Sequence, residues 1–325
     1  MRAFWYYLGL MGSYVVNALY IRTKIYYEDE SKQNKRIKGK AIVICNHKSP
    51  LDGLVILQKY PQRMINYVIA DFFQHKLRFV APLIRYTGGL IVDREAFNWD
   101  FYEKCKQLLN KEKVVLIFSE GRFNFGYEPI RFVNSYLMLA LQSGAPIVPI
   151  LSDLNYGWTK RVHILIGNSI DASTLVSPED MSKEAIKKAN EEIYQKLLSL
   201  YYQLKKRKYE KLSSTYSFSS PKPGDVIRIS AGTHYHYGVY LSHEEVIQFG
   251  HAVNTCGETV VVNAVTLDGF CNGKLPEVRE LTRWERRYVR DVEDIQRYAR
   301  QCIGRQGYNP LTNNCLDFAN RVVLK

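Results

Sequence analysis

The chain has 325 residues, of which 46% are hydrophobic, and this content excludes an intrinsically disordered protein. A chain of this length is expected to form two ordinary domains, each with its own core. Lysine and arginine number 45 against 32 aspartates and glutamates, so the formal net charge of +13 indicates either a solvated basic surface or an anionic partner. The six cysteines show neither a C-x-x-C pair nor Cys/His ligand spacing. They therefore indicate no zinc site and no disulfide framework, and they fit a reducing cytoplasm.

The start of the chain carries no charge from Ala3 to Ile21 and has tyrosine and tryptophan toward its ends, as at membrane interfaces. We predict that residues 1–25 associate with a membrane, as a monotopic anchor or as a single span. A hydrophobic helix packed against the following domain is the alternative. No small-x-small site precedes Arg22 and Lys24, so a cleaved signal peptide is not expected, and these basic residues favour the cytoplasmic face.

Two basic clusters, at residues 32–40 and 205–208, indicate which anion the positive charge attracts. Because the apolar start lies in the same chain, these clusters suit a membrane phospholipid surface. No recognition motif indicates nucleic acid, so we expect no nucleic-acid partner.

Short apolar runs alternate with helical patterns over the first two thirds of the chain. The predicted strands are residues 41–45, 90–92, 114–118, 146–150 and 162–167, and a helix is predicted from Pro50 to about Lys59. Such alternation predicts an α/β domain, which we place at residues 26–210. A long amphipathic helix closes it, and one face of this helix carries Ala185, Ala189, Ile193, Leu197, Leu200 and Leu204.

A serine- and proline-rich segment, residues 211–220, then reads as a linker. After it, closely spaced strands are predicted at 226–229, 237–241, 245–249 and 259–265, with helices near 291–303 and 315–323. Residues 221–325 are therefore predicted to form a small α+β domain.

His47 directly follows the first predicted strand, and Asp52 stands five positions later. An imidazole with a pKa of about 6.5 accepts a hydroxyl proton at neutral pH, and a carboxylate on its other nitrogen fixes its orientation. Three further segments follow in order: GLIVDR, which ends at Arg94, FSEGRFN, which contains Glu120, Gly121 and Arg122, and APIVPI at residues 145–150.

With these four motifs in register, the chain resembles the glycerolipid acyltransferases that make phosphatidate from lysophosphatidate. The resemblance implies a mixed sheet flanked by helices, with His47 as the base on the acceptor hydroxyl and Asp52 as its orienting partner. It also implies that Arg94 and the loop of Glu120, Gly121 and Arg122 bind the glycerol phosphate of the acceptor, with guanidinium groups as the partners of the phosphate. The acyl donor would be acyl-coenzyme A or an acyl-carrier protein, and no bound cofactor or metal is expected. The family's proline is Ser119 here, and its Thr-Arg pair is Arg122-Phe123.

A second set of motifs, PKPGD at residues 221–225, HYGVYL from His236 and NNC ending at Cys315, lies in the last third. Here the chain resembles the lecithin:retinol acyltransferase-like thiol family, which are permuted relatives of papain-type peptidases. The resemblance implies His236 as base and Cys315 as nucleophile. Gln248 stands where the family commonly has a second histidine, and its amide is able to orient the imidazole. His251 is a possible substitute for that missing third member.

These resemblances predict a membrane-associated acyltransferase that acts on a lysophosphatidate-like acceptor in phospholipid synthesis or remodelling, followed by a thiol acyltransferase or hydrolase. One hypothesis joins the two: the thiol domain removes an acyl chain, and the His47 domain re-acylates the lysolipid. Two alternatives stay open. Cys315 would instead drive a cysteine amidase, peptidase or N-acyltransferase, or the chain would be a non-catalytic membrane scaffold.

Overall fold

The computed structural model contains two compact units, Met1–Leu204 and Lys205–Lys325, which are described separately. The described residues are 2–31, 36–49, 51–70, 87–92, 99–124, 129–130, 132–153, 155–158, 160–177, 181–209, 215–251 and 260–325.

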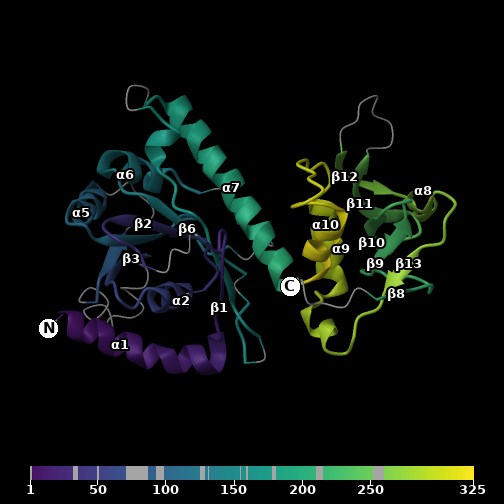
Figure 1. Ribbon diagram of the computed structural model, residues 1–325, viewed down its shortest axis with the longest axis horizontal. Coiled ribbons are helices and arrows are strands. Elements are labelled where there is room, and N and C mark those ends of the chain that lie inside the picture. Colours follow the sequence, from purple (N-terminus) through teal and green to yellow (C-terminus); the bar gives the residue numbers. More distant parts are fainter. Residues whose placement is uncertain are drawn as a thin grey trace. The chain divides into compact units, whose positions relative to one another are not determined.

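In the described part of the first unit, seven strands form one sheet, and helices lie around it (Figure 1). Their order is β1 (Lys24–Tyr27), β7 (His163–Ile166), β6 (Ile147–Ser152), β2 (Ala41–Cys45), β5 (Val114–Phe118), β3 (Ile65–Ala70) and β4 (Gly89–Val92). All neighbouring pairs are parallel except β6 and β7. The predicted α/β class, with a mixed sheet flanked by helices, is thereby confirmed.

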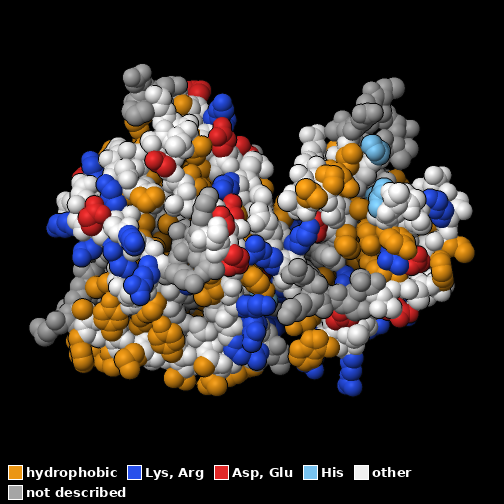
Figure 2. All heavy atoms as spheres, viewed as in Figure 1, with side chains coloured by type: hydrophobic (Ala, Val, Ile, Leu, Met, Phe, Trp, Pro, Cys, Tyr) orange, Lys and Arg blue, Asp and Glu red, His pale blue; other side chains and the backbone are white. Residues whose placement is uncertain are grey.

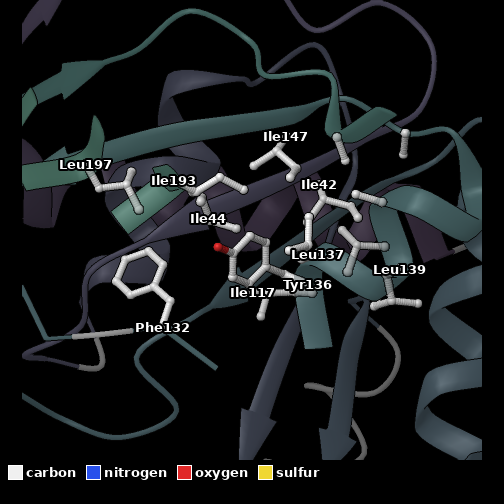
Figure 3. Packing of buried hydrophobic residues seen from close by; sticks show 14 of the residues in the cluster. Ile42, Ile44, Ile117, Phe132, Tyr136, Leu137, Leu139, Ile147, Ile193 and Leu197 are labelled. Carbon is white, nitrogen blue, oxygen red and sulfur yellow. The ribbon is translucent and has the colours of Figure 1, made fainter. Parts of the chain in front are cut away.

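The two faces of this sheet are covered by different helices. Because side chains alternate along a strand, Ile42 and Ile44 of β2 join one core and Val43 joins the other. The first core contains residues of α5 (Trp99–Asn110), α6 (Ser135–Ser143) and α7 (Lys183–Tyr209), and Figure 3 shows Tyr136 of α6 and Ile193 of α7 within it. The second contains residues of α1 (Arg2–Val16) and α2 (Asp52–Lys59).

Helix α7 packs as its apolar spacing predicts. Five of the six predicted face residues are buried in the first core, and Ala185 packs against it. Helix α2 begins at Asp52, whereas the predicted start, Pro50, lies outside the described residues. A carboxylate in the first turn of a helix is stabilised by the exposed N–H groups there, which favours this start.

The apolar start of the chain forms α1, followed by a π-helical turn, Asn17–Ile21. One side packs on the first unit: Tyr6 and Leu10 are buried, and Ser13 accepts a 2.7 Å hydrogen bond from Nε2 of Gln58. Among the described residues, no helix is both long and apolar enough to cross a membrane.

The described residues of the second unit form an antiparallel sheet of six strands. Their order is β12 (Val260–Val265), β11 (Glu245–His251), β10 (Tyr235–Ser242), β9 (Val226–Ser230), β13 (Glu277–Arg279) and β8 (Tyr216–Ser217). Strand β8 therefore lies within the segment expected to be a linker. Helices α8 (Leu267–Cys271), α9 (Val292–Gln301) and α10 (Cys315–Val323) complete the predicted α+β domain.

Candidate active sites

His47 lies at the edge of the first sheet where three parallel strands end. Cys45 of β2 pairs with Phe118 of β5 on one side and with Ile150 of β6 on the other. The segments that follow these strands therefore leave the sheet together, at the edge where open α/β sheets bind their ligands.

His47 and Asp52 form a buried pair, as their spacing predicts. The imidazole Nδ1 lies 2.9 Å from Oδ2 of Asp52, and the two residues are only 6% and 2% exposed. A carboxylate accepts hydrogen bonds and does not donate them, so Nδ1 carries the proton and Nε2 keeps its lone pair. The main-chain N–H groups of Lys48 and Ser49 also donate to Oδ2, at 2.7 and 2.9 Å. This arrangement leaves Nε2 as the basic nitrogen.

The second oxygen of Asp52 has a partner that the sequence analysis missed. The hydroxyl of Tyr156 donates to Oδ1 of Asp52. Burial, together with the charge of Asp52, raises the pKa of Tyr156 well above its ordinary value, so the phenol keeps its proton. Asn46 positions the segment after β6 that carries Tyr156, because its side chain pairs with the backbone of Ser152 through two hydrogen bonds of 2.8 and 2.9 Å.

The ring of His47 lies between two aromatic side chains. Its centroid is 3.9 Å from that of Phe118, with which it is stacked, and 4.3 Å from that of Phe123. These contacts restrict rotation of the imidazole. They were not predictable from the sequence, because Phe118 and Phe123 are distant from His47 along the chain.

Glu120 is buried, and its carboxylate holds the loop around His47. One oxygen accepts the main-chain N–H of His47 at 3.0 Å, and the other accepts hydrogen bonds from Asn124 and from the main chain of Ile130 at 3.1 and 3.0 Å. Burial raises the pKa of Glu120 to about 7 in spite of these donors. The structure thus gives Glu120 a role in positioning His47, and phosphate binding by this residue stays a prediction.

The neighbouring residues of the loop are accessible. Gly121 has a φ of +68°, which a residue with a Cβ rarely adopts, and it accommodates the sharp turn after Glu120. Arg122 is exposed beside it. Arg94 lies outside the described residues, and β4 ends at Val92, so its place relative to His47 stays a prediction.

The second candidate site lies on β10 and β11. Nε2 of His236 is 2.8 Å from Oε1 of Gln248, and Nε2 of Gln248 is 3.1 Å from Oδ1 of Asn263 on β12. Burial lowers the pKa of His236, so the imidazole is neutral near pH 7. His251 lies exposed at the end of β11, and Asn263 takes the place beside Gln248.

Cys315 is the first residue of α10, where Asn314 and Asp317 form a capping box. Main-chain N–H groups of Tyr237, the residue after His236, and of Leu316 act to lower the pKa of its thiol. Burial outweighs these donors and raises the pKa of the thiol. No hydrogen bond between the His236 imidazole and the Cys315 thiol is found among the described contacts.

Two family models match the chain, one for each unit. The model described as "Acyltransferase" matches residues 24–153, and the model described as "Lecithin retinol acyltransferase" matches residues 219–324. The chain joins an acyltransferase domain to a lecithin retinol acyltransferase domain. Both predicted resemblances are thereby confirmed, with His47 to Arg122 inside the first domain and His236 to Cys315 inside the second.

Relatives of the acyltransferase domain include 1-acyl-sn-glycerol-3-phosphate acyltransferases of two Limnanthes species. The chain is 26% identical to the Limnanthes alba protein over 135 residues, covering 40% of this chain and 47% of the relative. It is 26% identical to the Limnanthes douglasii protein over 131 residues, covering 39% and 46%. The chain therefore spans about half the length of these relatives.

A crystal structure of the 1-acyl-sn-glycerophosphate acyltransferase of Thermotoga maritima also matches, with 18% identity and a TM-score of 0.43. The match covers 60% of this chain and 76% of the Thermotoga protein.

Proposed function

We propose that the acyltransferase domain transfers a fatty acyl group from an acyl thioester to the hydroxyl of a lysophosphatidate-like acceptor, in phospholipid synthesis or remodelling. The observation that carries this proposal is the buried pair of His47 and Asp52, which leaves Nε2 of the imidazole basic. The Limnanthes relatives, both 1-acyl-sn-glycerol-3-phosphate acyltransferases, support the choice of acceptor. The donor thioester is acyl-coenzyme A or an acyl-carrier protein.

The proposed reaction proceeds in a single displacement without an acyl-enzyme. Nε2 of His47 takes the acceptor's hydroxyl proton while the oxygen attacks the thioester carbonyl. The tetrahedral intermediate then collapses, the C–S bond breaks, and the imidazolium returns its proton to the departing thiolate. Asp52 stabilises the transient imidazolium, because its carboxylate already accepts the Nδ1–H.

For the acceptor phosphate we propose guanidinium partners, Arg122 and Arg94. Arg122 is exposed and follows Gly121, directly beside the Glu120 that holds the main chain of His47. A phosphate bound here would bring the acceptor hydroxyl of the same small molecule toward the base. Arginine suits a phosphate because its planar fork donates two parallel hydrogen bonds.

We also propose that α1 binds the cytoplasmic face of a phospholipid membrane. The stripe Phe4, Leu8, Met11, Val15 and Leu19, spaced by three and four residues, is exposed by 46% to 68%, and Figure 2 shows hydrophobic side chains gathered along α1. The opposite side of the helix is occupied by its contacts with the first unit. Such a helix lies in the membrane interface with its apolar side among the acyl chains.

For the lecithin retinol acyltransferase domain, we propose thiol acyl transfer or hydrolysis by Cys315 with His236 as base. The observation that favours it is the position of Cys315 as the first residue of α10, where main-chain N–H groups of Tyr237 and Leu316 act to lower the pKa of the thiol. Because burial raises the pKa of Cys315 and lowers that of His236, the resting pair is a neutral thiol and a neutral imidazole. The proton therefore moves during attack on the acyl carbonyl.

The proposal is tested by phosphatidate formation from lysophosphatidate and labelled acyl-coenzyme A, with an acyl-carrier protein donor in parallel. Detergent-purified wild type is compared with His47→Ala, Cys315→Ala and the control His163→Ala, which changes a histidine of β7. We expect turnover to be lost only with His47→Ala. Full turnover in His47→Ala would refute the His47 mechanism. No turnover in wild type with either donor would bring the Cys315 amidase or scaffold alternatives forward.

A further inference from the structure

The side-chain amide of Asn263 has an orientation that its surroundings dictate. Its Nδ2 lies 3.1 Å from the carbonyl oxygen of Gly250, 3.2 Å from that of His251 and 3.0 Å from that of Val261. An amide nitrogen donates to carbonyl oxygens, whereas an amide oxygen in the same place would face three acceptors and be repelled. The oxygen Oδ1 must therefore point the other way, toward Gln248.

The orientation of the Asn263 amide determines that of the Gln248 amide, which in turn determines which ring nitrogen of His236 carries the proton. Oδ1 of Asn263 only accepts hydrogen bonds, so the group 3.1 Å away must be the NH2 of Gln248. The Gln248 oxygen then faces Nε2 of His236 at 2.8 Å, and because it also only accepts, Nε2 must carry a hydrogen. A neutral imidazole holds one ring proton, so Nδ1 is left with its lone pair.

We infer that Asn263 is a positioning residue that selects the tautomer of His236 through Gln248 and makes Nδ1 the basic nitrogen. The role arises because Gln248 is an amide. A glutamine side chain turned by 180° presents its NH2 to the imidazole and stabilises the opposite tautomer, with the proton on Nδ1. Gln248 is 8% exposed, so little water is available to compensate a wrongly turned amide.

The functional meaning of this tautomer rests on the proposed thiol chemistry, in which the imidazole takes the proton of Cys315. Nε2 is held by Gln248, so the basic Nδ1 is the ring nitrogen that this contact leaves available to take the thiol proton. The tautomer itself is measurable without any substrate. Separate experiments therefore test the tautomer of His236 and the thiol function of Cys315, and each is refuted without the other.

The test uses the full chain labelled with ¹⁵N-histidine, and long-range ¹H–¹⁵N correlation spectra at pH 8, where burial of His236 keeps it neutral. The His236→Gln variant assigns the signals. In wild type we expect protonated Nε2 and unprotonated Nδ1 at His236. In Asn263→Ala this single pattern should give way to a mixture of both tautomers or to the Nδ1–H form.

A rescue and a control complete the experiment. Gln248→Glu in the Asn263→Ala background should restore the Nε2–H form, because a carboxylate only accepts and needs no partner to orient it. Thr266→Ala removes a different side-chain hydrogen bond, from Gly269 N–H after β12, and should leave the tautomer unchanged.

Two results would overturn the inference: Nδ1–H at His236 in wild type, or an unchanged pattern in Asn263→Ala. A Cys315→Ala variant with unaltered lipid products would refute the thiol function alone, and the expected tautomer pattern would still establish the role of Asn263.

Discussion

Tyr156 donates its hydroxyl to Oδ1 of Asp52, while His47 donates its Nδ1–H to Oδ2 of the same carboxylate. Both oxygens of the carboxylate are thus engaged, one by the imidazole and the other by the phenol. The tyrosine belongs to the segment after β6, so this contact links two strand ends at the site. We therefore regard Tyr156 as a residue that positions the His47–Asp52 pair.

Replacing Tyr156 with Phe should lower kcat/KM for acyl transfer by about 10-fold to 100-fold, since a hydrogen bond to a charged group contributes about 1.5–3 kcal/mol. Tyr60→Phe is the matched control, because the Tyr60 hydroxyl is buried without a hydrogen-bond partner among the described residues. Steady-state kinetics of both variants checks this. Equal rates for Tyr156→Phe and Tyr60→Phe would show that Tyr156 has no positioning role.

The pH dependence of stability should report on Glu120. Its pKa rises from an ordinary 4.5 to about 7, so the folded state holds a proton that the unfolded state has lost between these values. The contribution of Glu120 to the free energy of unfolding, about 3 kcal/mol, is therefore fully present below pH 4.5 and is lost as pH rises through about 7. Glu120→Gln should remove this part of the pH dependence.

The measurement for Glu120 is the free energy of unfolding against pH, by chemical denaturation of wild type and Glu120→Gln. Glu103→Gln, at an exposed carboxylate on α5, is the control and should follow wild type. Parallel curves for wild type and Glu120→Gln between pH 4.5 and 7 would contradict the buried-carboxylate interpretation.

Alkylation of Cys315 by iodoacetamide should be slow at neutral pH and should accelerate above pH 9, because burial raises the pKa of the thiol and only the thiolate reacts. Peptide mass spectrometry measures the rate at this residue, with glutathione as the reference thiol. Rapid alkylation at pH 6 would instead indicate a preformed thiolate–imidazolium pair with His236.

Met11→Asp should weaken vesicle binding, because it places a carboxylate in the middle of the exposed apolar stripe of α1. The loss of one buried side chain, about 1.5–3 kcal/mol, corresponds to a decrease of at least 10-fold in the partition coefficient. Met181→Asp is the matched control, since Met181 is also exposed, by 42%, and lies outside α1. Co-sedimentation with phosphatidylcholine and phosphatidylserine vesicles gives the comparison. Equal binding of the two variants would exclude α1 as the membrane contact.

Much of the fold was predictable because the signals are local. The run AIVIC forms a fully buried strand, and the spacing from Ala189 to Leu204 places one face of α7 in the core. The pairing of His47 with Asp52 was also predictable, since five residues cover only a turn between a strand and a helix. Strand β8 was not predictable, because its two residues lie in a serine-rich segment and are too few to show the alternation that indicates a strand.

The residues that orient each base were decided by the tertiary structure alone. Tyr156 lies 104 positions from Asp52, and it reaches the carboxylate only because β6 and β2 are neighbours in the sheet. Asn263 reaches Gln248 across β11 and β12, and the direction of its amide depends on three carbonyl groups that no sequence pattern encodes. The sequence by itself indicated the candidate catalytic groups, His47 with Asp52 and His236 with Cys315. Strand order and register decided which oxygen or nitrogen each one faces, because these contacts join residues that only the packed sheets bring within hydrogen-bond distance.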